Sequence, residues 1–68
     1  MFNKLSKLIT LETGYERVTP ETTLEDLGID SLEFLALIRA VEEGFGVEIP
    51  TDDLVKLQTV NDIAAYLA

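Results

Sequence analysis

The chain has 68 residues, which is enough for one small domain, and it contains no Cys and no His. Disulfides, zinc sites, a Ser-His-Asp triad and a Cys-His dyad are therefore excluded within it. Its net charge of −8 repels nucleic acid and anionic lipid and attracts basic surfaces on other proteins. The same charge also keeps a small domain in solution, so composition alone leaves both roles open.

The balance of residue types is that of a globular protein, with 47% hydrophobic and 26% charged residues. No apolar run approaches the length of a membrane span. Polar residues interrupt the apolar ones at the start of the chain, which disfavours a signal peptide. We expect a cytoplasmic protein that binds neither membrane nor nucleic acid.

The first predicted helix runs from about Phe2 to Glu12. Its apolar residues recur with the i, i+3, i+4 spacing of one helical face. They are Phe2, Leu5, Leu8 and Ile9. Gly14 is the expected stop, since glycine readily adopts the left-handed conformation that ends a helix.

The helical pattern lapses between Tyr15 and Asp30, where Thr19-Pro20 disfavours helix. We expect one short helical turn at Thr23–Leu27. Three apolar residues should hold this segment on the core, and they are Leu24, Leu27 and Ile29. A loop this long in a small domain is often functional, although a plain crossover between two helices would also explain it.

The second predicted helix has the clearest boundaries. Asp30 suits the N-cap position, and Glu33 completes a capping box with it. Ser31 then opens the first turn. The helix should end near Phe45, where glycines on both sides weaken it.

Two shorter helices follow an extended connector at 47–50. Thr51 is predicted to cap a short third helix that runs through Leu57. Thr59 is predicted to cap a fourth, with Asp62 as its capping-box partner. The inner stripe of the fourth helix comprises Val60, Ile63, Tyr66 and Leu67. The whole pattern predicts an all-α, small four-helix bundle with a long loop between helices one and two and a short third helix.

A helical wheel separates two faces of the second helix. The core stripe comprises Phe34, Leu37, Ile38, Val41 and Phe45. Leu32 and Leu35 lie outside it and have no obvious core to enter. Near Ile29 they form an apolar patch with acidic residues around it, and these are Asp26, Asp30, Glu33, Glu42 and Glu43. Such a patch suits transient protein binding, but isolated exposed leucines are also common by chance.

Three segments in the right order resemble the acyl carrier protein family. Residues 26–32 (DLGIDSL) resemble its D-L-G-x-D-S-L signature. Residues 41–50 resemble its E-E-x-F-x-x-E-I-P segment, and residues 59–63 its usual opening of the last helix. A lone D-S-L would carry little weight, whereas three segments at matching spacing identify the chain with this family over nearly its whole length.

The resemblance implies a single carrier domain over 1–68 with the acyl-carrier type of four-helix bundle. It implies that Ser31 carries a covalent 4′-phosphopantetheine arm, flanked by Asp30 and Leu32, and that the arm's thiol holds acyl groups as thioesters. The residues agree with this position, because free N–H groups at a helix N-terminus favour a phosphodiester. The negative charge of Asp30 would repel that phosphodiester unless its carboxylate caps the helix or binds the metal of the modifying enzyme.

The resemblance also implies the partners, which are a phosphopantetheinyl transferase and acyl-loading and acyl-processing enzymes with basic docking surfaces. The predicted partner-binding residues are Ile29, Glu33, Leu35, Ala36, Arg39, Glu42 and Glu43. We expect a monomer that is not an enzyme, with no catalytic residue and no metal site of its own. The transferase would supply the base and the metal.

Other interpretations of Ser31 stay open. It could be a helical serine without chemistry, or a phosphorylation site in a regulatory module. Residues 28–32 also resemble a G-D-S-L lipase block, but the spacing differs by one residue and no His can act as the base. At the level of the whole chain, the alternatives are a peptidyl or aminoacyl carrier and an unmodified helical interaction module.

Two positions depart from fatty-acid carriers of this family. Ala36 stands where a Glu is common, and Arg39 stands where an apolar residue is common. Both lie on the outward face, so a specialised carrier in polyketide or other secondary metabolism is as well supported as one in fatty acid biosynthesis. The resemblance further implies an acyl cavity whose size is set by Phe34, Leu37, Ile38 and Ile49.

Overall fold

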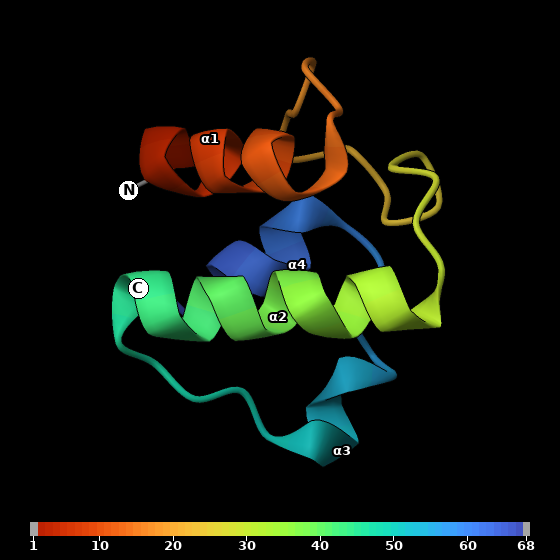
Figure 1. Ribbon diagram of the computed structural model, residues 1–68. Coiled ribbons are helices and arrows are strands. Elements are labelled where there is room, and N and C mark those ends of the chain that lie inside the picture. Colours follow the sequence, from red (N-terminus) through yellow and green to blue (C-terminus); the bar gives the residue numbers. More distant parts are fainter. Residues whose placement is uncertain (1, 68) are drawn as a thin grey trace.

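The computed structural model describes residues 2–67 (Figure 1). Over this range the chain forms four helices, and these are α1 (Phe2–Thr13), α2 (Ser31–Phe45), α3 (Thr51–Leu54) and α4 (Val60–Ala64). The only strand-like pairing among these residues is an isolated antiparallel bridge between Thr23 and Thr59. The predicted all-α fold, with its long first loop and short third helix, is confirmed.

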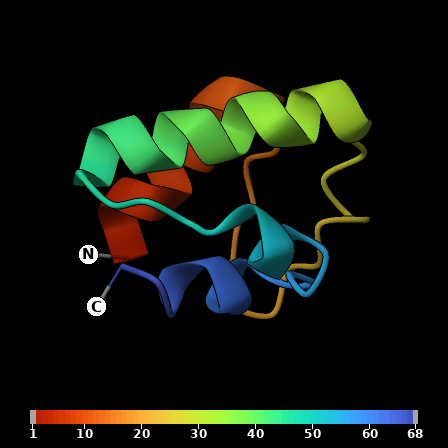
Figure 2. The same cartoon turned by 90° about the horizontal axis from the view of Figure 1, so that it is seen from below.

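The two long helices, α1 and α2, pack against each other. Seen from below, the short helices α3 and α4 lie on one side of α2, and the connector after α2 runs along that side to reach them (Figure 2). None of the four helices is long and apolar enough to cross a bilayer over the described residues. The helix α2 contributes three buried residues to the core, Leu37, Ile38 and Val41.

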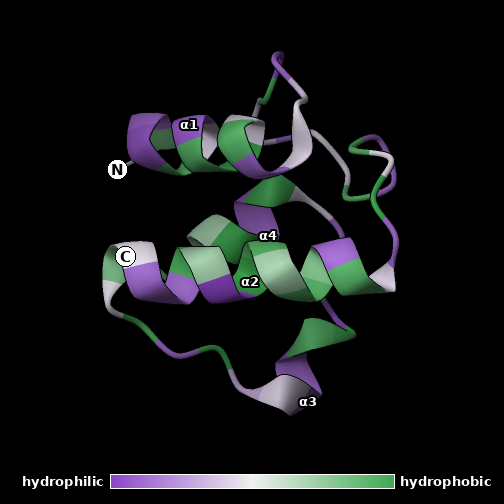
Figure 3. Ribbon diagram, viewed as in Figure 1, coloured by the Kyte–Doolittle hydropathy of each residue, from purple (hydrophilic) through white to green (hydrophobic). Residues whose placement is uncertain are grey.

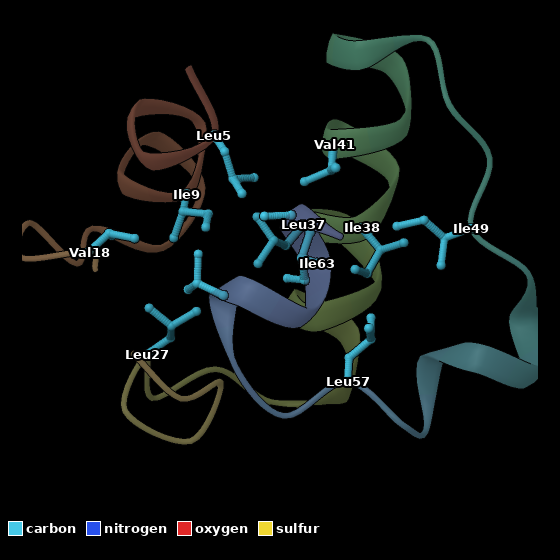
Figure 4. Packing of buried hydrophobic residues seen from close by; sticks show 12 residues of the cluster. Leu5, Ile9, Val18, Leu27, Leu37, Ile38, Val41, Ile49, Leu57 and Ile63 are labelled. Carbon is cyan, nitrogen blue, oxygen red and sulfur yellow. The ribbon is translucent and has the colours of Figure 1, made fainter. Parts of the chain in front are cut away.

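The core draws one or more residues from almost every segment (Figure 4). Its buried members are Leu5, Ile9, Val18, Leu27, Leu37, Ile38, Val41, Ile49, Leu57, Val60, Ile63 and Ala64. The middle of the predicted core stripe of the second helix is buried, while Phe34 and Phe45 at its two ends are half-buried. Colouring by hydropathy shows the alternation of apolar and polar residues along α1 and α2 (Figure 3).

The loop between α1 and α2 is attached to α4. It begins at Gly14, which has a φ of +80° and donates its N–H to the Thr10 carbonyl at 2.8 Å. The Leu24 N–H donates to the Gln58 carbonyl, and the Val60 N–H donates to the Thr22 carbonyl, both at 2.9 Å. These bonds provide hydrogen-bond partners for N–H and C=O groups of the loop backbone that would otherwise have none. They also fix the path of the chain toward α2.

The predicted short helical turn at Thr23–Leu27 corresponds to hydrogen-bonded turns over residues 24–28, while Thr23 itself forms the isolated bridge to Thr59. The Leu27 N–H donates to the Leu24 carbonyl, which is the tighter i to i+3 pattern. The turns do not extend into a longer helix, because Thr23 is paired with Thr59, the N-cap of α4, on one side and Gly28 has a φ of +67° on the other. Leu27 is nevertheless buried, and Leu24 and Ile29 pack against the core, as predicted.

The predicted start and end of the third helix are wrong. The helix is Thr51–Leu54, and Pro50 rather than Thr51 is the N-cap, without a side-chain hydrogen bond. The ring of Pro50 restricts its φ, which is −57°, and its ψ of 138° is extended, so Thr51 is the first residue with helical backbone. Beyond Leu54 the chain continues in tighter turns, in which the Leu57 N–H donates to the Leu54 carbonyl at 3.3 Å.

The predicted cap of the fourth helix is confirmed. The Thr59 hydroxyl accepts the Asp62 N–H, and the Asp62 carboxylate accepts the Thr59 N–H. The same carboxylate accepts the Gln58 N–H at 2.9 Å. These backbone donors hold the pKa of Asp62 below its usual value, because they stabilise the ionised form. Within the predicted inner stripe, Val60 and Ile63 are buried and the two later residues are half-buried.

Candidate functional site

The site that the sequence singled out lies at the N-terminus of α2. The Asp30 carboxylate accepts the Glu33 N–H at 2.8 Å, and the Glu33 carboxylate accepts the Asp30 N–H at 3.3 Å. This reciprocal pair is the predicted capping box. Because its two residues satisfy each other, the N-cap of α2 needs no hydrogen bond from a distant segment.

Ser31 is the first helical residue, and it is exposed to solvent. The N–H groups of Glu33 and Phe34 are taken by the Asp30 side chain and carbonyl. Within residues 2–67, the N–H groups of Ser31 and Leu32 have no protein acceptor. Two free N–H donors beside an exposed hydroxyl suit a phosphoryl group attached at that hydroxyl, so the residues present fit a phosphopantetheine arm.

A hollow of about 300 Å³ opens beside Ser31. It lies between the end of the first loop, the start of α2, α3 and the turn that follows α3. Its lining is Leu24, Glu25, Ile29, Asp30, Ser31, Phe34, Leu54 and Leu57. Most of these side chains are apolar, so the hollow offers hydrophobic contact within a few ångströms of the serine.

The four residues expected to set a cavity do not share one. Phe34 lines the hollow beside Ser31, whereas Leu37 is fully buried in the core. Ile38 and Ile49 line a second hollow of about 360 Å³ between α2 and the connector. Leu54 and Leu57, which the sequence reasoning did not assign to the site, line the first hollow instead. Their only signal was apolar character in a predicted short helix.

One exposed stripe runs along α2, and it is called the α2 stripe below. Its residues are Leu32, Leu35, Ala36, Arg39 and Glu43, all exposed and spaced as neighbours on one helical face. The side chains of Leu32 and Leu35 are 77% and 52% exposed, so neither enters the core. Ile29, at the start of the stripe, is half-buried and packs against the core.

The acidic residues near the stripe differ in how they are engaged. Glu42 is half-buried, and its carboxylate accepts the Ile49 N–H at 2.8 Å, so it holds the connector against α2. Glu33 is engaged in the capping box, although it remains exposed. Glu43 has no such bond within residues 2–67 and is exposed. In the same range Arg39 forms no ion pair with Glu42 or Glu43, which lie three and four residues away.

Comparisons with known proteins agree with this geometry. The family described as "Phosphopantetheine attachment site" matches residues 3–67. An acyl carrier protein of Nitratidesulfovibrio vulgaris (strain DSM 19637 / Miyazaki F) is 48% identical, over 94% of this chain and 88% of that protein. The crystal structure of an acyl carrier protein from Thermotoga maritima superimposes with a TM-score of 0.79 at 25% identity, covering 97% of this chain and 80% of that one. The chain therefore belongs to the acyl carrier protein family, whose members are phosphopantetheine-bearing carriers and not enzymes.

Proposed function

We propose that Ser31 is the residue that carries the 4′-phosphopantetheine arm of this acyl carrier protein. The observation that carries the proposal is the exposed hydroxyl at the first position of α2, beside two N–H groups that have no acceptor within residues 2–67. Those donors would stabilise the negative charge of a phosphodiester. Asp30, although anionic, has its carboxylate directed to the Glu33 N–H and so acts as a cap.

Attachment makes one bond and breaks one. The Ser31 oxygen would bond to the phosphorus nearest the pantetheine in coenzyme A, the pyrophosphate bond would break, and adenosine 3′,5′-bisphosphate would leave. The hydroxyl proton would go to a base on the transferase, since this chain contains no His. When bound, the arm supplies a thiol that holds an acyl group as a thioester. Asp30 would keep Ser31 in place, and Leu32 would offer an apolar contact beside it.

We further propose that the chain works as one carrier domain over residues 1–68, as a cytoplasmic monomer. One continuous core over the described residues supports the single domain. The exposed positions of Ala36 and Arg39 support a specialised pathway, such as polyketide or related secondary metabolism, as well as they support fatty acid biosynthesis. Both residues would change contacts with partner enzymes and leave the core untouched.

The α2 stripe, with Ile29 and Glu33 at its start, is proposed as the docking surface for the transferase and for acyl-loading and acyl-processing enzymes. Two exposed leucines provide apolar contact, and acidic groups around them attract basic surfaces. Arg39 would meet an acceptor group on those partners. Glu42 is expected to act indirectly, because its carboxylate is already engaged with the connector.

The attachment site is tested by intact mass spectrometry before and after incubation with coenzyme A and a broad-specificity phosphopantetheinyl transferase. We expect a gain of one phosphopantetheine, mapped to the peptide that contains Ser31. Ser31→Ala should abolish the gain, and Ser6→Ala, which removes the only other serine, should retain it. A folded Ser31→Ala protein, verified by circular dichroism, that still accepts the arm would refute the assignment.

The docking surface is tested by the rate of the same loading reaction. Glu43→Lys should slow loading several-fold at low salt, and the difference should shrink as salt screens the charges. Glu16→Lys is the matched control, because it makes the same change of net charge at an exposed loop position. Equal slowing by both variants would show that net charge matters and that the stripe does not.

A further inference from the structure

The charge of the chain is unevenly distributed between its elements. Two lysines and one glutamate give α1 a net charge of +1. The whole chain has −8, which leaves −9 to all the other residues. The helices α2, α3 and α4 each carry more acidic than basic residues. An acidic partner would therefore be repelled by most of this molecule and attracted chiefly to α1.

The positive charge of α1 lies beside apolar surface. A hollow of about 430 Å³ runs along this helix, and we call its lining the α1 face, which consists of Asn3, Lys4, Lys7, Leu8 and Leu11. The spacing from Lys4 to Leu11 is i, i+3, i+4, i+7, so these side chains share one side of the helix. Leu11 is 84% exposed, the second-largest exposure among the large apolar residues of 2–67.

The core accounts for only part of this apolar surface. The buried residues of α1 are Leu5 and Ile9, and Leu8, at the edge of their stripe, packs against the core. Leu8 is half-buried, and one of its methyl carbons approaches Gly44 so closely that a Cβ there would lie 2.9 Å away. Leu11 lies one turn further along and extends the apolar surface of Leu8 into solvent. The apolar surface of Leu8 and Leu11 thus begins at the contact with α2 and continues into solvent.

The α1 face is also held in place. The Lys4 ammonium donates to the Gly44 carbonyl at 2.6 Å and lies 4.8 Å from the centre of the Phe45 ring. These contacts fix the N-terminal half of α1 against the end of α2. Lys7 has no ion pair within residues 2–67 and is exposed, so its charge is available to a partner. A surface that is already ordered loses little entropy when it binds.

We propose that the α1 face docks an acidic amphipathic helix of a partner protein. Apolar side chains of such a helix would fill the hollow beside Leu8 and Leu11, and its carboxylates would face Lys7 and the exposed side of Lys4. The charge pattern selects this partner, because a basic helix would instead go to α2, which carries three glutamates and one arginine. The two surfaces would let the carrier bind partners of opposite charge, with or without the arm on Ser31.

The probe is a synthetic amphipathic helix made of Glu and Leu, titrated into the isotope-labelled apo protein and followed by amide NMR shifts. We expect saturable shifts in α1 and at Gly44, and none along the α2 stripe. A Lys-Leu peptide with the same leucine spacing should shift the α2 stripe and leave α1 unchanged. Shifts along the α2 stripe with the acidic peptide, or no shifts at all, would overturn the proposal.

Substitutions can distinguish binding at the α1 face from a general effect of the net charge of the protein. Lys7→Glu and Leu11→Ser should each weaken binding of the acidic peptide by about tenfold, since one replaces attraction by repulsion and the other removes apolar contact. Lys56→Glu makes the same charge change at an exposed position outside α1 and should have little effect. Equal weakening by Lys7→Glu and Lys56→Glu would refute a local site.

Two other occupants are distinguished by the same spectra. Shifts in α1 that appear with anionic phospholipid vesicles and not with the peptide would identify a membrane surface and overturn the proposal. Shifts in α1 that depend on protein concentration alone would identify a second copy of the chain, with the same consequence. None of these results depends on whether Ser31 is modified, so failure here leaves the carrier function untouched.

Discussion

The two ends of α2 are built in different ways. At the N-terminus, Asp30 and Glu33 cap each other, and no residue from another helix is needed. At the C-terminus, Gly46 adopts a φ of +65° and returns its N–H to the Glu42 carbonyl. The Gly44 carbonyl is then capped by Lys4, which belongs to α1. One end is thus complete in itself, and the other is completed by a distant segment.

This difference between the two ends of α2 explains how Ser31 can be exposed while the backbone around it is well defined. Because the first turn of α2 is self-capped, Ser31 and Leu32 can face solvent without loosening the helix. The opposite end has the hydrogen bonds to other segments, including the bond from the Ile49 N–H to the Glu42 carboxylate. The cap beside the proposed attachment point is therefore local, although Phe34 packs against the core, and the hydrogen bonds to distant segments lie at the opposite end.

The largest effect is expected from Gly44→Val, which overfills the packed end. A Cβ at this position would lie 2.9 Å from a Leu8 methyl carbon, and the branched side chain adds further atoms. Overpacking of this kind costs about 1–3 kcal/mol of unfolding free energy. Urea denaturation followed by circular dichroism measures the loss. Loading at Ser31, assayed under conditions where the variant is folded, should stay near the wild-type rate.

Gly44→Ala is the matched control for that substitution. Its single added carbon meets the flexible end of Leu8, which can move, and alanine favours helix over glycine by about 1 kcal/mol. The two terms offset, so we expect a stability close to wild type. If Gly44→Val were as stable as the wild type, or slowed loading while folded, the separation between the two ends of α2 would be wrong.

A smaller effect is expected from Asp30→Ala, which removes the cap of the exposed end. Loss of an N-cap side chain costs about 1 kcal/mol, and here the Glu33 N–H would lose its acceptor at 2.8 Å. Asp30→Asn should restore most of this stability, because asparagine also accepts at the N-cap. The comparison is made by urea denaturation of all three proteins. Equal destabilisation by Ala and Asn would mean that the charge of Asp30, and not its capping bond, stabilises the helix.

Much of the fold and the position of the candidate site were predictable from the sequence. Short spacings predicted the capping boxes at Asp30 and Thr59, the buried centre of the core stripe of the second helix and the exposure of Leu32. The prediction at Thr51 was wrong because Pro50 set the backbone and took the cap position. The turns at 24–28 do not lengthen into a helix, because Thr23 pairs with Thr59, a contact that the sequence did not predict.

The sequence by itself determined the features that depend on residues three or four positions apart, since helical periodicity and capping act within one turn. Only the tertiary structure decided which side chains line the hollow beside Ser31, that Glu42 holds Ile49, and that Lys4 caps Gly44. The last pair is 40 positions apart along the chain. No local pattern constrains such a contact, because it exists only once the core has brought α1 and α2 together.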